Sequence, residues 1–155
     1  MFVSEIERLA AVDAIRTVKA RYWRGVDLSD GDLVRSILHE DCELDYRGCC
    51  TDPTSGQDFF PAMNVVLRGS ASWTSDAFRK ARIVSVHQGQ GDDIEILDET
   101  HATGIWSFTD RFFYPAGAPY RRLVGYGFYH DSYEKTAGAW KLKTTRIERL
   151  RVEAE

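Results

Sequence analysis

The stretch HATGIWSFTDRFFY, residues 101–114, decides the fold of this chain. Trp106, Phe108 and Asp110 alternate with Ile105, Ser107 and Thr109, which places the two sets on opposite faces of an extended segment. Similar alternation continues outward on both sides of this stretch, so we expect further strands at 79–88, 93–98, 120–134 and 140–152. The segments are separated by short turn-compatible residues: Gly89/Gly91, Glu99-Thr100, Ala116-Gly117-Ala118-Pro119 and Thr136-Ala137-Gly138. Connections this short predict an antiparallel meander.

The first third of the chain reads as helical. Ser4 followed by Glu7 predicts a capping box at the start of a long helix. Apolar side chains then recur every three or four residues and predict one buried stripe: Ile6, Leu9, Val12, Ile15, Val18 and Tyr22. The segment 28–32 interrupts this pattern, and a shorter helix then carries Leu33, Val34, Ile37 and Leu38 on one face.

The middle of the chain has a weaker pattern. Residues 42–47 (CELDYR) alternate enough to predict a short strand. Ser55-Gly56-Gln57-Asp58 looks like another helix start, with Pro61 tolerated in the first turn. The inward-facing side chains of that helix would be Phe59, Phe60, Met63, Val66 and Leu67.

Helices first and a long-stranded sheet second predict an α+β domain. At 155 residues the chain is most simply one domain, residues 1–155. A strongly twisted, mainly antiparallel sheet curled over the N-terminal helices would form a cone with a pocket inside.

Composition excludes several classes of function. The net charge of −4 provides no basic field for a nucleic acid backbone. Three cysteines, Cys42, Cys49 and Cys50, suit neither a disulfide framework nor a zinc site, so we expect reduced thiols. The N-terminal MFVSEIERLA has no basic segment followed by an apolar run. We therefore expect no signal peptide, no membrane span and a cytoplasmic location.

His87 and Asp110 are the most informative pair of polar residues, because both lie on predicted strands. A carboxylate beside a histidine fixes the ring tautomer and stabilises the imidazolium, which makes a general base. A purely structural role is the alternative for each residue: His87 could fill the core, and Asp110 could begin a solvated loop. Asp110 follows an aromatic row, and an unpaired buried carboxylate is costly, so His87 is its expected partner.

Three further residues could join that pair. Tyr22 lies on the apolar stripe of the first helix, where its hydroxyl could donate to a carbonyl oxygen or simply sit in the core. Asp27 lies near the end of that helix and could accept from Tyr22 or cap the next helix. Arg149 lies within RIERLR, where the direction of its side chain is open.

The chain resembles the SnoaL-like branch of the NTF2-like superfamily, and within it the scytalone dehydratase and bile acid 7α-dehydratase families. The matching segments span most of the chain, with 48–78 the weakest region: AIRTVKARYWRGVD, VHQGQGDDIEI, HATGIWSFTDRF and GFYHDSYEKTAGAWKL with the following strand. The bile acid dehydratases carry the same residue types at the positions of Tyr22, Asp27, His87, Asp110 and Arg149. The fungal scytalone dehydratases use a second histidine in the strand that carries Trp106 here, and this chain does not reproduce that arrangement.

The resemblance implies a cystatin-like or NTF2-like cone and a lyase that needs neither cofactor nor metal. The expected reaction is dehydration of a small apolar, hydroxylated alicyclic or aromatic carbonyl compound. His87, oriented by Asp110, would remove the proton, Tyr22 would donate to the developing oxyanion, and Asp27 would hold Tyr22 or its water. Arg149 would position Asp110 or polar substrate groups, and Trp106 and Phe108 would contact the substrate. His39, His101 and His130 are given no role.

Other functions remain open. The same dyad could serve an isomerase, a cyclase or a carbon–carbon lyase, and the fold also carries non-catalytic ligand-binding and assembly roles. An open sheet face with Phe112, Tyr126, Phe128 and Trp140 would remain apolar until a second copy covered it, which predicts a homo-oligomer, either dimer or trimer.

Overall fold

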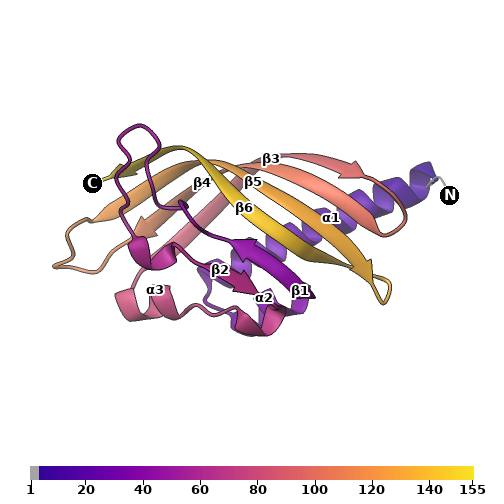
Figure 1. Ribbon diagram of the computed structural model, residues 1–155, viewed down its shortest axis with the longest axis horizontal. Helices are drawn as coiled ribbons and strands as arrows, with labels where there is room; N and C mark the ends of the chain where they lie inside the picture. The colour runs from indigo at the N-terminus through magenta and orange to yellow at the C-terminus, as the bar shows by residue number, and fades with distance from the viewer. Residues whose placement is uncertain (1–3) are drawn as a thin grey trace.

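The computed structural model describes residues 4–155 and is built around one curved sheet of six strands (Figure 1). The strands are β1 (Leu38–Asp45), β2 (Val66–Arg68), β3 (Val84–Ile96), β4 (His101–Phe113), β5 (Arg122–Thr136) and β6 (Ala139–Ala154). Their order across the sheet is β2-β1-β6-β5-β4-β3. Strands β3 to β6 form the predicted antiparallel meander, and β1 pairs with β6 in the parallel direction. The predicted α+β class and mainly antiparallel sheet are confirmed.

The helices are α1 (Glu5–Asp27), which passes behind the sheet in Figure 1, and α2 (Gly31–Ile37) and α3 (Asp76–Ala81), which lie below it in that view. Two short 3-10 turns, η1 (Pro61–Met63) and η2 (Ser70–Ser72), lie between β1 and α3. The predicted capping box at Ser4 and Glu7 is present. None of the helices within residues 4–155 combines the length and the apolar character needed to cross a bilayer.

Only part of the predicted apolar stripe on α1 is buried. Ile15, Val18 and Tyr22 lie in the core, whereas Ile6 is 81% exposed and Leu9 is 54% exposed. The N-terminal end of α1 reaches the outer limit of the molecule, where no strand lies beneath it (Figure 1). The prediction that Ile6 and Leu9 face the core was therefore wrong.

The expected helix beginning at residues 55–58 does not form. Side chains in this segment bind backbone N–H groups instead: Asp52 accepts from Ser55, Asp58 accepts from Phe60, and Asn64 accepts from Gly48. Such local hydrogen bonds compete with helix formation. The chain here forms an irregular loop, the turn η1 and the short strand β2.

The predicted strands at 79–88 and 93–98 also need correction. Residues 79–81 belong to α3, which ends where Arg82 takes a left-handed conformation with φ of 54°. From Val84 onward the two predicted strands are one strand, because Gly89 and Gly91 flank a β-bulge and not a turn.

The proposed open apolar face is partly wrong. Phe112 is 5% exposed and Trp140 is 6% exposed, so both belong to the core. Phe112 has the same strand parity as Asp110, which fixes it on the inner face. Tyr126, 39% exposed, and the half-buried Phe128 do lie on the outer face of β5. A homo-oligomer stays a prediction, now carried by these two side chains.

Candidate active site

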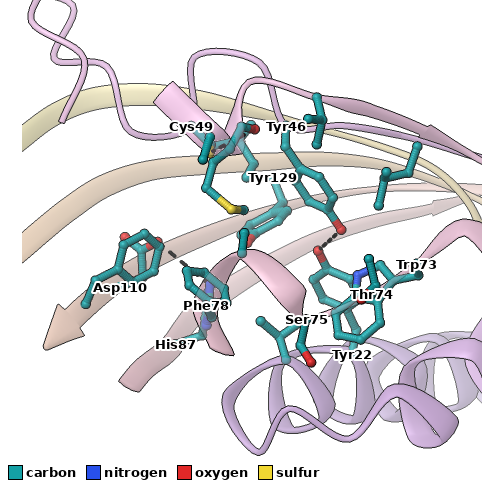
Figure 2. Close-up of a pocket in the computed structure, with 18 of the residues that line it drawn as sticks. Tyr22, Tyr46, Cys49, Trp73, Thr74, Ser75, Phe78, His87, Asp110 and Tyr129 are labelled. Atoms are coloured by element: carbon teal, nitrogen blue, oxygen red, sulfur yellow. Dashed lines mark hydrogen bonds and ion pairs between the residues drawn. The ribbon is translucent and has the colours of Figure 1, made fainter. Parts of the chain in front are cut away.

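A cavity of about 200 Å³ lies between the inner face of the sheet, α1 and the loop that contains η1. Figure 2 shows His87 and Asp110 on one side of this cavity and Tyr22 and Tyr46 on the other. Four of the five predicted catalytic residues line it: Tyr22, His87, Asp110 and Arg149. The fifth, Asp27, lies behind His87. The rest of the wall is largely apolar and includes Met63, Leu67, Trp73, Phe78, Phe112 and Ile147.

His87 is held by Asp27, the last residue of α1. The Oδ1 atom of Asp27 lies 2.6 Å from His87 Nδ1, and its Oδ2 atom accepts the backbone N–H of His87 at 2.8 Å. Ser85 donates its hydroxyl to the same carboxylate at 2.9 Å. An ionised carboxylate only accepts hydrogen bonds, so this contact places the imidazole proton on Nδ1. The Nε2 atom is on the other side of the ring, 3.7 Å from Asp110 Oδ2.

Asp110 has a different partner from the one predicted. Both of its carboxylate oxygens accept from Arg149, each at 2.8 Å, and its Oδ2 atom lies 3.7 Å from His87 Nε2. His87 and Asp110 are directly opposed on β3 and β4, so the prediction that they meet is correct. The predicted role is not: Asp27 makes the orienting hydrogen bond, and Asp110 supplies negative charge near Nε2.

The Asp110–Arg149 pair reaches across β5 from β4 to β6. Both side chains are 4% exposed. Gly125 is the β5 residue opposite Asp110, and a Cβ atom at that position would overlap both charged groups. Burial alone would lower the pKa of Arg149, but the charge and hydrogen bonds of Asp110 outweigh burial, so the pKa is raised. The guanidinium also donates to the carbonyl of Cys49 at 2.5 Å, which fixes the pair in place.

Tyr22 bonds to Tyr46 and not to Asp27. The two phenol oxygens are 2.7 Å apart. Burial raises the pKa of both phenols, so both remain protonated at neutral pH. Because one hydroxyl donates to the other, the second hydroxyl proton is available to an acceptor in the cavity. The prediction that Asp27 accepts from Tyr22 was wrong, and Tyr46 takes that place.

The two predicted substrate contacts lie behind the cavity wall. Trp106 donates its indole N–H to Tyr133 at 3.0 Å and packs edge-on against Trp23. Phe108 stacks on the ring of His87, with 6.5 Å between ring centroids, and packs at a tilt against Tyr129 at 4.3 Å. Neither residue lines the cavity. Both are correctly placed on the inner face, but the first layer of side chains separates them from the cavity.

The remaining histidines lie elsewhere. His39 is buried near Lys143 and Glu134, His101 contacts Asp98, and His130 contacts Glu148. In the part of the chain that the structure describes, no group of three or more His, Cys, Asp or Glu side chains is arranged to hold a metal ion.

Two tyrosines that line the cavity were not predicted as site residues: Tyr46, one residue after β1, and Tyr129 on β5. Strand parity contained a signal for Tyr129, because its neighbours at even positions, Tyr126 and Phe128, face outward. Tyr46 had a similar signal within the predicted strand 42–47, because it shares its parity with the buried Cys42 and Leu44.

The chain belongs to the SnoaL-like domain family, whose model matches residues 7–146. The fold is also similar to several solved structures. One is a Novosphingobium aromaticivorans protein provisionally assigned as a scytalone dehydratase, with TM-score 0.77, 19% identity, and coverage of 98% of this chain and 92% of that one. Another is a hexachlorocyclohexane dehydrochlorinase from Novosphingobium barchaimii, with TM-score 0.73, 18% identity, and coverage of 98% and 94%. A Mycobacterium tuberculosis protein of unknown function has TM-score 0.71, 21% identity, and coverage of 94% and 76%. At these identities the likeness establishes the fold.

Proposed function

We propose that the protein is a cofactor-independent lyase that removes water from a small, uncharged, hydroxylated carbonyl compound. The observation that carries this proposal is the Asp27–His87 hydrogen bond, which engages Nδ1 of a histidine that lines the cavity and leaves Nε2 without a hydrogen bond. This arrangement of carboxylate, imidazole and open cavity is that of a general base. Two structural neighbours have names that describe elimination reactions, a dehydratase and a dehydrochlorinase, which agrees with this chemistry.

The proposed reaction begins at a carbon next to a carbonyl group. His87 Nε2 takes the proton from that carbon, while the Tyr22–Tyr46 pair donates a hydrogen bond to the carbonyl oxygen. The electrons of the broken C–H bond form the new C=C bond as the neighbouring C–O bond breaks. The departing hydroxyl then takes the proton from Nε2 and leaves as water, which restores His87. Asp27 and Asp110 both carry negative charge near the ring and stabilise the imidazolium between these steps.

The cavity wall favours an uncharged substrate. Arg149 is the one arginine or lysine among the residues that line the cavity within 4–155, and both ends of its guanidinium fork bind Asp110. A substrate carboxylate would therefore find no unpaired cation. Aromatic and aliphatic side chains make most of the remaining wall, which suits an alicyclic or aromatic ring.

The test is a screen of hydroxylated aromatic, steroid and polyketide ketones with product masses measured. We expect an alkene whose mass is lower by one water. His87→Ala should lower kcat/KM by about 10²- to 10⁴-fold, because the general base is lost. His101→Ala is the matched control, since that ring is exposed and contacts Asp98. A product of unchanged mass would indicate an isomerase or cyclase instead, and full activity of His87→Ala would exclude this base.

A further inference from the structure

Tyr129 is the one cavity phenol without a hydrogen-bond partner in the described chain. The residue is 2% exposed, yet its hydroxyl is not sealed inside the protein, unlike that of Tyr114. Tyr22 and Tyr46 bond to each other and Tyr133 donates to Asp131, so these three hydroxyls have partners. A buried polar group normally finds a partner, so a phenol that opens into a cavity indicates that a ligand supplies it.

The ring of Tyr129 is firmly held. Phe108 packs on it with ring centroids 4.3 Å apart, and Tyr22 and Trp23 make edge contacts at 6.1 and 5.8 Å. The ammonium group of Lys19 lies 3.7 Å from the ring centroid. A ring held this way presents its hydroxyl at a fixed point and needs little reorganisation on binding.

The hydroxyl lies between the two halves of the site. Figure 2 shows Tyr129 in the middle of the cavity, between the Tyr22–Tyr46 pair and the His87–Asp110 side. Burial raises the pKa of Tyr129 well above its usual range, and the charge of Asp110 raises it further. The phenol therefore acts as a hydrogen-bond donor at neutral pH and not as a base.

We propose that the Tyr129 hydroxyl is a further catalytic group, which donates a hydrogen bond to the hydroxyl that leaves the substrate. This inference rests on the proposed dehydration. In the proposed reaction the substrate carbonyl oxygen accepts from the Tyr22–Tyr46 pair. The Tyr129 hydroxyl is a second donor in the same cavity, so it needs a second substrate oxygen as its acceptor. The site is then built for a β-hydroxy ketone. As the C–O bond breaks, its electron pair goes to the departing oxygen, which takes its proton from His87 Nε2. Tyr129 keeps its own proton throughout.

The binding test is a thermodynamic double-mutant cycle, in which the Tyr129 hydroxyl is removed from the protein and the leaving hydroxyl is removed from the ligand. Kd values are measured for β-hydroxytetralone and for tetralone with two proteins that cannot turn over substrate: the single variant His87→Ala, which keeps Tyr129, and the double variant His87→Ala/Tyr129→Phe. When Tyr129 is present, β-hydroxytetralone should bind about 3- to 10-fold more tightly than tetralone. With Tyr129→Phe the two ligands should have equal Kd values. Tyr126→Phe is the control, because Tyr126 lies on the outer face of the same strand. Equal hydroxyl effects with and without Tyr129, or no binding of either tetralone, would overturn the proposal.

The kinetic test compares leaving groups. On β-hydroxytetralone, Tyr129→Phe should lower kcat/KM by about 10- to 100-fold. On β-chlorotetralone the loss should stay within about threefold, because chloride is a weak acceptor and leaves without a donor. Equal losses on both substrates would assign Tyr129 a merely structural role. If the binding cycle succeeds while the wild-type protein eliminates from neither tetralone, the contact stands and the proposed dehydration fails.

Discussion

At the scale of single residues, the charge on Asp27 decides whether His87 can act as a base. The Asp27 carboxylate accepts three hydrogen bonds, from Ser85, from the His87 backbone and from the His87 ring. An amide in its place can donate to the ring, which would favour the tautomer with its proton on Nε2. That tautomer cannot take a proton at the cavity side.

Asp27→Asn should therefore lower kcat by about 10²- to 10⁴-fold while the cavity keeps its shape. Asp32→Asn is the control, since its side chain is 98% exposed. The measurement is kcat and KM on a substrate found by the screen, with circular dichroism to confirm folding. Wild-type activity in Asp27→Asn together with an inactive Asp110→Asn would restore Asp110 as the orienting carboxylate.

The sequence could place the residues of this site on their elements but could not pair them. Strand parity put Asp110 on the same face as Trp106 and Phe108, and the apolar stripe put Tyr22 in the interior. Asp27 and His87 are 60 positions apart, and their contact depends on where α1 ends against β3. Asp27 lies 2.6 Å from the imidazole and Asp110 lies 3.7 Å from it, and alternation patterns do not contain a difference that small.

At the scale of elements, β5 needs a glycine where the charged pair crosses it. Asp110 on β4 and Arg149 on β6 meet above Gly125, and both occupy the space that a side chain would fill. The whole group is buried, so it has little freedom to move aside. The alternating pattern correctly predicted the antiparallel meander of β3 to β6. It did not predict the bulge between Gly89 and Gly91 on β3, which was read as a turn.

Gly125→Ala should displace the Asp110–Arg149 pair. We expect a loss of about 1–3 kcal/mol in the free energy of unfolding, because the added methyl group overpacks the site. The activity should fall by about 10- to 100-fold, because Asp110 moves relative to His87. Urea unfolding and kcat/KM measure the two effects.

Gly91→Ala provides the comparison for that variant. Gly91 also lies in a strand, but a Cβ atom there would meet nothing within 4 Å. Equal stability and activity in the two glycine variants would show that the pair is not confined by β5.

At the scale of the whole molecule, the interior concentrates phenols that resist ionisation. Burial is the largest cause of a raised pKa at five tyrosines: Tyr22, Tyr46, Tyr114, Tyr129 and Tyr133. Lys19 works in the opposite direction, because burial lowers its pKa to about 8. It lies fully buried against Asp131, with its ammonium group 2.7 Å from the carboxylate.

These shifts predict that stability falls at alkaline pH. The unfolded chain releases tyrosine protons near about pH 10, whereas the folded protein retains them. Above that pH the folded state binds more protons than the unfolded state, so the free energy of unfolding decreases as pH rises. Lys19 contributes the reverse slope from its folded pKa of about 8 up to the ordinary lysine value of 10.5, but it is one group against five.

Urea unfolding at about pH 8, 10 and 11, with tyrosinate absorbance recorded alongside, tests this expectation. Tyrosinate from the buried phenols should appear together with unfolding and not before it. Tyr114→Phe is the matched variant, because the Tyr114 hydroxyl is buried without a partner. It should keep the stability of the wild type near neutral pH to within about 1 kcal/mol and weaken the alkaline slope. A stability that stays constant up to about pH 11, or an unchanged slope in Tyr114→Phe, would show that the folded interior does not hold these protons.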